Sequence, residues 1–225
     1  MKIAISSGHA KDVAGAVGPE PWGLVEVDEA RRIVNQVASV LALHDGIDVV
    51  TFHDNVSQTQ DQNLLAIVSW HEAKKADINI SVHLNAFEKT SAPRGVEVLY
   101  RDEVEMAREM SAAIAGCGLI DRGPKERTDL YFLNSLPRSI LIETCFVDSE
   151  TDARIYREMF NEICDAIANT LSDGQVERAP APDDYPAVAT PERPVVKIDI
   201  EVPDGVEVSL AVNGLNVFLG TEDPD

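Results

Sequence analysis

Ile78-Asn79-Ile80-Ser81-Val82-His83-Leu84-Asn85 contains a β-rich apolar run, which predicts a strand over residues 78–84. A helical pattern over residues 63–76 comes before this run. Further outward, strands are predicted over residues 2–6, 48–52, 95–100, 130–133 and 138–144, and helices over residues 26–44, 104–115 and 148–171. Strands that alternate with helices predict an α/β domain with a central, mostly parallel sheet flanked by helices on both faces.

Polar side chains stand where three of the predicted strands end. His83 lies near the end of the run quoted above, His9 follows Ile3-Ala4-Ile5-Ser6-Ser7-Gly8, and Glu143 follows Ile140-Leu141-Ile142. Because ligands gather beyond the carboxyl ends of parallel strands, we expect these side chains to lie together. Two imidazoles and a carboxylate are one ligand set of a catalytic zinc, and a second carboxylate suits the general base that hydrolysis needs. The pattern therefore predicts metal-assisted hydrolysis, with Glu26 as the further acid between the two histidines in sequence.

Each of these residues also has a structural explanation. Either histidine could be a buried imidazole with ordinary protein partners, and an acid such as Glu26 is favoured in the first turn of a helix by the helix dipole. Glu143 could form an ion pair with Arg138 or Arg94. The other three histidines have no partner in the sequence pattern and are interpreted as surface or helix-end residues: His44, His53 and His71.

The charge and length of the chain exclude several classes of function. The chain has 225 residues and a net charge of −20, which argues against nucleic acid and against an anionic membrane surface. No apolar run approaches the ~18 residues of a membrane span. The amino terminus is not typical of a signal peptide, so the protein is expected to be cytoplasmic on synthesis and to reach any outside target only through a separate release step.

The cysteines do not form a recognisable motif. Cys117, Cys145 and Cys164 are few and odd in number, which fits a reduced protein better than a disulfide scaffold. Cys145 lies two residues after Glu143, so it is an alternative nucleophile. The favoured interpretation is a small buried side chain.

The composition changes after residue 174. Residues 175–194 are rich in proline and acidic residues and predict an extended linker. Residues 195–225 contain three strand-like runs separated by Pro203-Asp204-Gly205 and Asn213-Gly214, which predict a small β-meander. We therefore expect a main domain over residues 1–174, a linker over residues 175–194, and a small C-terminal β module over residues 195–225 that mediates binding to another molecule or homo-oligomerisation.

Several motifs, taken in order, resemble the zinc-dependent N-acetylmuramoyl-L-alanine amidases of the Amidase_3 type. The resemblance begins with Ser7-Gly8-His9 and Gly23-Leu24-Val25-Glu26. It continues through Ala76–Ala86 and Gly95–Tyr100 to the segment Pro137–Asp148. It covers essentially all of residues 1–171. One departure is Ala10-Lys11 after the first histidine, where the family commonly has glycine.

The resemblance implies a role for each motif residue. His9, Glu26 and His83 match the zinc ligands, and Glu143 matches the catalytic glutamate. Asn85, next to the second histidine motif, is a candidate substrate-binding residue. The implied cofactor is Zn²⁺, and the implied fold is the α/β domain that the pattern also predicts.

The implied substrate is peptidoglycan. The reaction cleaves the amide between N-acetylmuramic acid and L-alanine of the stem peptide. Together with the missing signal peptide, this resembles a phage or prophage endolysin that a holin releases to the cell wall. Two alternatives stay open: a zinc peptidase or deacetylase acting on another amide, and a non-catalytic wall-binding protein that keeps the fold.

Overall fold

The computed structural model describes residues 1–172 and two short strands further on, β7 (Ala211–Val212) and β8 (Leu215–Asn216). These two strands pair antiparallel with each other across Asn213-Gly214. The chain divides into two units, Met1–Ala179 and Pro180–Asp225. The predicted linker and most of the predicted meander lie outside the described residues. No helix in the described part of the chain is long and apolar enough to cross a membrane.

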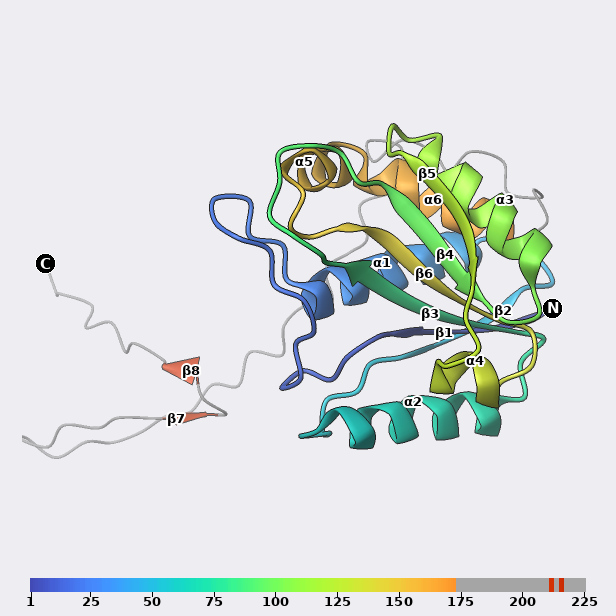
Figure 1. The fold of residues 1–225 in the computed structure, drawn as a ribbon. Coiled ribbons are helices and arrows are strands. Elements are labelled where there is room, and N and C mark those ends of the chain that lie inside the picture. The colour runs from blue at the N-terminus through green and yellow to red at the C-terminus, as the bar shows by residue number, and fades with distance from the viewer. Residues whose placement is uncertain (173–210, 213–214, 217–225) are drawn as a thin grey trace, which may run out of the picture. The chain divides into compact units, whose positions relative to one another are not determined.

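Six strands form one sheet in the order β2-β1-β3-β6-β4-β5 (Figure 1). Their bounds are β1 Lys2–Ser7, β2 Asp48–Phe52, β3 Ile78–Asn85, β4 Val96–Tyr100, β5 Asp121–Glu126 and β6 Ser139–Phe146. All neighbouring pairs are parallel except β4 with β6, which is antiparallel. The central strands β3 and β6 are almost fully buried, as expected for strands covered on both faces. The predicted α/β class and mostly parallel sheet are confirmed.

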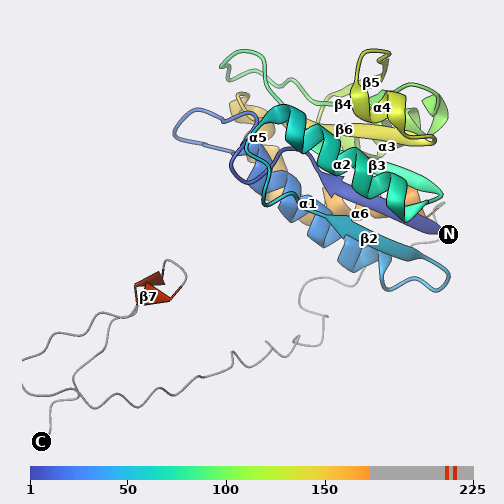
Figure 2. The ribbon, with the colours of Figure 1, turned by 90° about the horizontal axis from the view of Figure 1, so that it is seen from below.

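Helices cover both faces of this sheet (Figures 1 and 2). Their bounds are α1 Glu26–Leu41, α2 Gln60–Lys74, α3 Val104–Ala115, α4 Tyr131–Ser135, α5 Glu150–Glu158 and α6 Phe160–Leu171. One face carries α1, α3 and α6, with α6 in contact with both α1 and α3, and the other face carries α2 and α4. The larger hydrophobic core therefore lies under α1, α3 and α6, and a smaller one lies under α2 and α4.

Three local predictions are wrong. Residues 130–133 were expected to form a strand, but Leu130 is the extended residue before α4, where Phe132 and Leu133 point into the smaller core. Residues 148–171 form two helices, because the backbone leaves helical geometry at Met159 (φ −116°, ψ 24°). Strand β5 was not anticipated, since it is a polar edge strand. Packing and pairing partners, which a local pattern does not contain, decide all three cases.

Candidate metal centre and catalytic site

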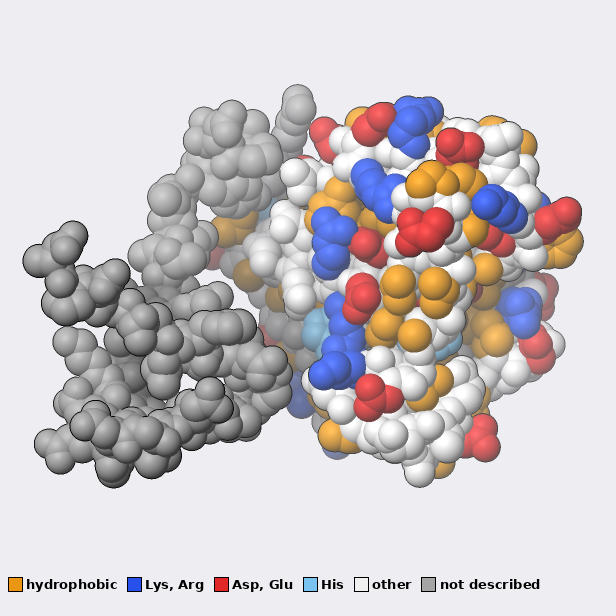
Figure 3. Space-filling model, turned by 90° about the vertical axis from the view of Figure 1, so that its left-hand side faces the viewer, with side chains coloured by type: hydrophobic (Ala, Val, Ile, Leu, Met, Phe, Trp, Pro, Cys, Tyr) orange, Lys and Arg blue, Asp and Glu red, His pale blue; other side chains and the backbone are white. Residues whose placement is uncertain are grey.

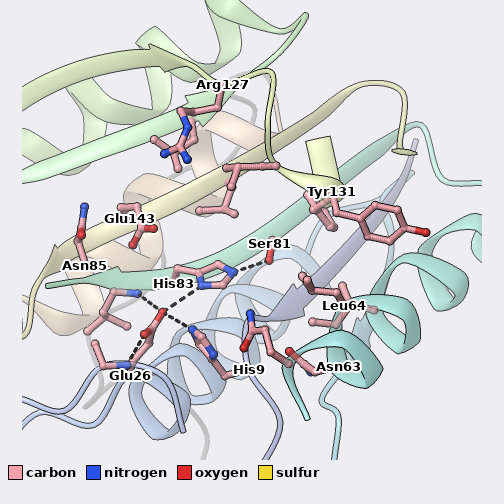
Figure 4. Close-up of a pocket in the computed structure, with 18 of the residues that line it drawn as sticks. His9, Glu26, Asn63, Leu64, Ser81, His83, Asn85, Arg127, Tyr131 and Glu143 are labelled. Atoms are coloured by element: carbon pink, nitrogen blue, oxygen red, sulfur yellow. Dashed lines mark hydrogen bonds and ion pairs between the residues drawn. The ribbon is translucent and has the colours of Figure 1, made fainter. Parts of the chain in front are cut away.

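The four predicted residues of the site come from four different elements. His9 lies two residues beyond β1, and His83 lies near the end of β3. Glu26 is the first residue of α1, and Glu143 lies in β6. Strands β3 and β6 are neighbours, and His83 is paired in register with Glu143. The sheet therefore fixes His83 beside Glu143, while the segment between His9 and Glu26 brings the first histidine and the helix end to the same place (Figure 4).

Glu26 lies between the two histidines. Its Oε1 is 3.0 Å from Nε2 of His9 and 3.0 Å from Nδ1 of His83. The imidazole rings are edge-to-face, with their centroids 5.2 Å apart. One ligand atom from each of the three residues lies within 4.8 Å of the others, so the group could hold a metal ion. Figure 3 views the molecule from the side on which β1 and β3 end.

The carboxylate of Glu26 is buried, and hydrogen bonds stabilise it. It accepts hydrogen bonds from the backbone N–H of Ala16 at 2.7 Å and of Leu84 at 3.3 Å. Burial alone would raise its pKa, but hydrogen bonds and positive charge from His83 and His9 outweigh burial and hold the pKa well below the usual range. Glu26 is therefore an ionised carboxylate, as a metal ligand must be.

The backbone around the site is strained and tightly packed. His9 has φ 54°, a left-handed conformation that a residue with a Cβ adopts at a cost of about 1 kcal/mol or more. Two glycines leave room for the side chains: a Cβ on Gly8 would lie 2.0 Å from the His83 ring, and a Cβ on Gly15 would lie 2.4 Å from Glu26 Oε2. These close approaches explain why the two positions are glycine.

Glu143 has no partner to balance its charge in residues 1–172. Its Oε2 is enclosed and accepts no hydrogen bond there. Burial and the neighbouring carboxylates of Glu26 and Glu97 raise the pKa of Glu143 to about 8, and Arg127 opposes this rise only in part.

Neither ion pair that the sequence left open for Glu143 is present. Arg138 faces Glu103 at 3.6 Å. Arg94 donates to the carbonyl of Glu88 and stacks over aromatic rings.

The residues present fit a zinc ion. Two imidazoles and one ionised carboxylate form a complete three-residue ligand set. Nε2 of His9 and Nδ1 of His83 both face Glu26 Oε1 at 3.0 Å, so one nitrogen of each ring is directed at the same carboxylate oxygen. His83 is oriented by Ser81, whose Oγ lies 3.0 Å from Nε2. Metal-binding histidines commonly have such a partner on their second nitrogen.

The site opens into a cavity of about 440 Å³. One end is polar and contains the histidines, Glu26 and Glu143. The other end lies under α2 and α4 and is mostly apolar, with large aliphatic or aromatic side chains that include Leu64, Ile67, Val68, Leu99, Phe132 and Leu141. A polar centre next to an apolar recess is typical of a small-molecule site.

Asn85 lines the cavity, but its side chain is already engaged. Its amide N–H donates to Glu97 Oε1 at 2.9 Å, and its oxygen accepts from the backbone N–H of Ala86. Glu97 is held in turn by Arg122 at 2.7 Å. Substrate binding by Asn85 therefore stays a prediction, and the visible contact is with the Glu97 carboxylate.

Cys145 is a structural residue. Its side chain is fully buried, and burial raises the pKa of the thiol well above the usual value. A neutral thiol without access to solvent is not a nucleophile. The interpretation as a small core residue holds.

Sequence reasoning missed two features near the site. Arg127 and Asp129 follow the polar strand β5 and line the cavity, yet no sequence pattern marks them. His71 lies in the last turn of α2, but it is buried and has two partners instead of facing solvent. A histidine flanked by the buried positions Ile67 and Val68 in the same helix was the available signal.

Comparison with known proteins places these residues in a family. Residues 3–173 match the family model described as N-acetylmuramoyl-L-alanine amidase. The N-acetylmuramoyl-L-alanine amidase LytC of Bacillus subtilis is 26% identical over 181 residues, which cover 77% of this chain and 34% of that protein. The chain spans 34–55% of the length of the curated relatives that it matches.

Solved structures have the same fold. The catalytic domain of the CD27L endolysin, which targets Clostridium difficile, matches with a TM-score of 0.68 at 24% identity and covers 79% of this chain and 99% of that one. The amidase AmiC2 of Nostoc punctiforme matches with a TM-score of 0.65 at 28% identity and covers 77% of this chain and 96% of that one. The shared region is the α/β unit that carries the site.

Proposed function

This chain belongs to the N-acetylmuramoyl-L-alanine amidase family, and we propose that it hydrolyses the amide between the lactyl group of N-acetylmuramic acid and L-alanine of the peptidoglycan stem peptide. The observation that carries the proposal is the arrangement of His9, Glu26 and His83 opposite an enclosed carboxylate that lacks a partner, Glu143. An enclosed carboxylate oxygen without a hydrogen-bond partner is costly, so Oε2 of Glu143 supports a chemical role for this residue.

The proposed cofactor is one Zn²⁺ held by His9, Glu26 and His83. When bound, zinc lowers the pKa of a water molecule and polarises the amide carbonyl. His9 lies just beyond β1, Glu26 begins α1, and His83 lies in β3, so we expect the packed sheet and helix to keep the three ligands in place before substrate arrives.

Glu143 is the proposed proton carrier. It accepts a proton from the attacking water and returns it to the leaving nitrogen of L-alanine. The C–N bond breaks, the water oxygen joins the lactyl carbonyl carbon, and the products are a muramyl carboxylic acid and a peptide with a free amine. A base must be ionised, and the raised pKa of Glu143 arises from burial and like charge. A divalent cation nearby counteracts both causes.

The proposed setting is the bacterial cell wall. Release would depend on a holin, as for a phage endolysin, or on another export route. Residues 195–225 would target the wall or join copies of the chain, and both roles are proposals about a segment that lies almost entirely outside the described residues.

The proposal is tested by digesting purified peptidoglycan with and without a chelator, followed by mass spectrometry of the fragments. We expect free stem peptides that begin with L-alanine, lost on chelation and restored by zinc. Cleavage at a different amide would replace the assigned bond with that of a zinc peptidase or deacetylase. Muropeptides that stay intact under all conditions, while the protein sediments with the wall, would identify a binding protein instead.

A further inference from the structure

Arg127 stands out among the residues that line the cavity because it is the one lysine or arginine among them. The other charged side chains of the lining are the acids Glu26, Asp129 and Glu143. Arg127 follows β5, and its backbone N–H donates to the carbonyl of Tyr100 at 2.8 Å. In a chain of net charge −20, a single cation in the cavity is the natural contact for an anionic group of a ligand.

The guanidinium of Arg127 is held in a fixed orientation. Its Nε donates to Asp129 Oδ1 at 2.7 Å, and its Nη2 donates to Asp129 Oδ2 at 2.8 Å. This two-point contact occupies one edge of the planar group. The edge that carries Nη1 donates to no other residue in the range 1–172, and the side chain is 41% exposed. Asp129 therefore holds Arg127 in place and leaves its second edge available for a ligand.

Arg127 lies on the Glu143 side of the cavity (Figure 4). Figure 4 shows the guanidinium above Glu143, on the other side of Glu143 from the histidines. The positive charge of Arg127 also opposes the rise in the pKa of Glu143. If Glu143 delivers a proton to the leaving nitrogen, the leaving peptide must lie on this side.

The chemistry of the proposed substrate limits which anion can reach Arg127. The muramyl carboxyl group is consumed in the scissile amide, and the carboxyl group of L-alanine is consumed in the next peptide bond. The nearest free carboxylate on the leaving side therefore belongs to the second residue of the stem peptide or to a later one. A planar guanidinium binds a carboxylate through two parallel hydrogen bonds, whereas a carboxamide offers one acceptor and no charge.

We infer that Arg127 is a specificity-determining residue that binds a free carboxylate of the stem peptide, just beyond the L-alanine that leaves. The inference rests on the proposed function, because it takes the substrate and the direction of proton transfer from it. It goes further by predicting which form of the wall the enzyme prefers: stem peptides with a free carboxylate next to L-alanine over peptides that carry a carboxamide there.

The test uses two soluble muramyl peptides that differ only in this group, one with a carboxylate and one with a carboxamide on the second residue. We expect the wild-type protein to cleave the carboxylate form with a kcat/KM roughly 10- to 100-fold higher, which is the range of one charge-assisted contact. The lower kcat/KM of the carboxamide form should come mainly from a higher KM. Arg127→Ala should lose this preference, and Arg127→Lys should keep part of it.

Arg108→Ala is the matched control. Arg108 is also an exposed arginine paired with an acid, Glu105, but it lies on α3 and does not line the cavity. It should keep the wild-type preference. Thermal unfolding of each variant shows whether the fold is intact, and the exposed position of Arg127 predicts that it is.

The outcomes separate this inference from the proposed function. Equal cleavage of both peptides by the wild-type protein overturns the inference and leaves the amidase function standing. A uniform loss on both peptides in Arg127→Ala also overturns it, because Arg127 would then act through Glu143. Cleavage of neither peptide by the zinc-loaded wild-type protein contradicts the proposed function itself, and the inference fails with it.

Discussion

His71 and His9 lie at different places on this sheet and differ in whether both of their ring nitrogens have hydrogen-bond partners. His71, on the α2 face, is buried, and both of its ring nitrogens have partners: Asn79 Oδ1 at 3.0 Å and Ser6 Oγ at 2.9 Å. At the carboxyl edge, His9 keeps an enclosed Nδ1 without a partner in the described residues. Glu143 Oε2 near it is in the same state.

The difference separates structure from function. A buried polar atom without a partner costs about 1–3 kcal/mol of stability. His71 is complete within the protein and supports the packing of α2. At the carboxyl edge, two enclosed atoms lack a partner within residues 1–172, and we propose that a metal and a substrate bind there. Changes at His71 should therefore affect stability, and changes at the site should affect activity.

The largest effect is expected from His9→Gly. The variant lacks one metal ligand, so zinc binding and peptidoglycan hydrolysis should both fall to background. Its stability without metal should change by no more than about 1 kcal/mol, because glycine relieves the positive φ and offsets the lost contact with Glu26. Zinc content per chain, digestion assays and chelator-treated unfolding curves measure the three quantities. Full zinc content in the variant would contradict the assignment of His9.

The next effect compares two glycines that both have positive φ. Gly15 (φ 71°) and Gly46 (φ 84°) both have positive φ, but only at Gly15 would a Cβ meet site atoms, at 2.4 Å from Glu26 Oε2. Gly15→Ala should push the Glu26 carboxylate out of position. Zinc binding should then weaken roughly 10- to 100-fold, as it does when a residue that orients a metal ligand is changed. Gly46→Ala should leave zinc affinity unchanged and cost only about 1 kcal/mol of stability. Equal zinc affinity in the two variants would show that crowding at Gly15 is not important.

His71→Ala should have the opposite pattern. It leaves Asn79 Oδ1 and Ser6 Oγ without this partner and removes a ring packed against Phe132, so we expect a loss of about 2–4 kcal/mol in the free energy of unfolding. Hydrolysis per folded molecule should hardly change, because His71 does not line the cavity. His44→Ala, at a half-buried turn, serves as the control and should stay within about 0.5 kcal/mol of wild type.

The smallest effect is a pH dependence that belongs to His71. Burial lowers its pKa from 6.5 to about 4, which a hydrogen bond with Asn79 opposes only in part. Between these values the unfolded chain binds a proton that the folded chain does not, so the stability contributed by neutral His71 is lost as pH falls. At 1.36 kcal/mol per unit, about 2 kcal/mol should disappear between pH 6.5 and pH 5.

Other groups also titrate in this range, so the quantity to measure is the difference between wild type and His71→Gln. Denaturant unfolding at a series of pH values supplies it. A difference that does not narrow as pH falls would mean that His71 is not held neutral by the fold.

The sequence predicted which residues meet at the carboxyl edge of the sheet better than it predicted what surrounds them. His9, His83 and Glu143 follow or end apolar runs, and parallel strands bring such positions to one edge, so local pattern and topology were sufficient to place them. Arg127 and Asp129 could not be found this way, because they follow a strand that contains Gly123 and Pro124 and has no apolar pattern. The partners of His71 lie on β1 and β3 and exist only once α2 packs on the sheet.

The central claim is that the metal ligands and the proton carrier are separate groups, and Glu143→Gln tests it most directly. Zinc affinity is measured by calorimetric titration, and hydrolysis of peptidoglycan by the same preparation is measured by mass spectrometry. We expect zinc binding within a few-fold of wild type and a rate of hydrolysis lower by about 10²–10⁴-fold, the usual contribution of a general base. Unchanged hydrolysis, or loss of zinc together with activity, would contradict the account.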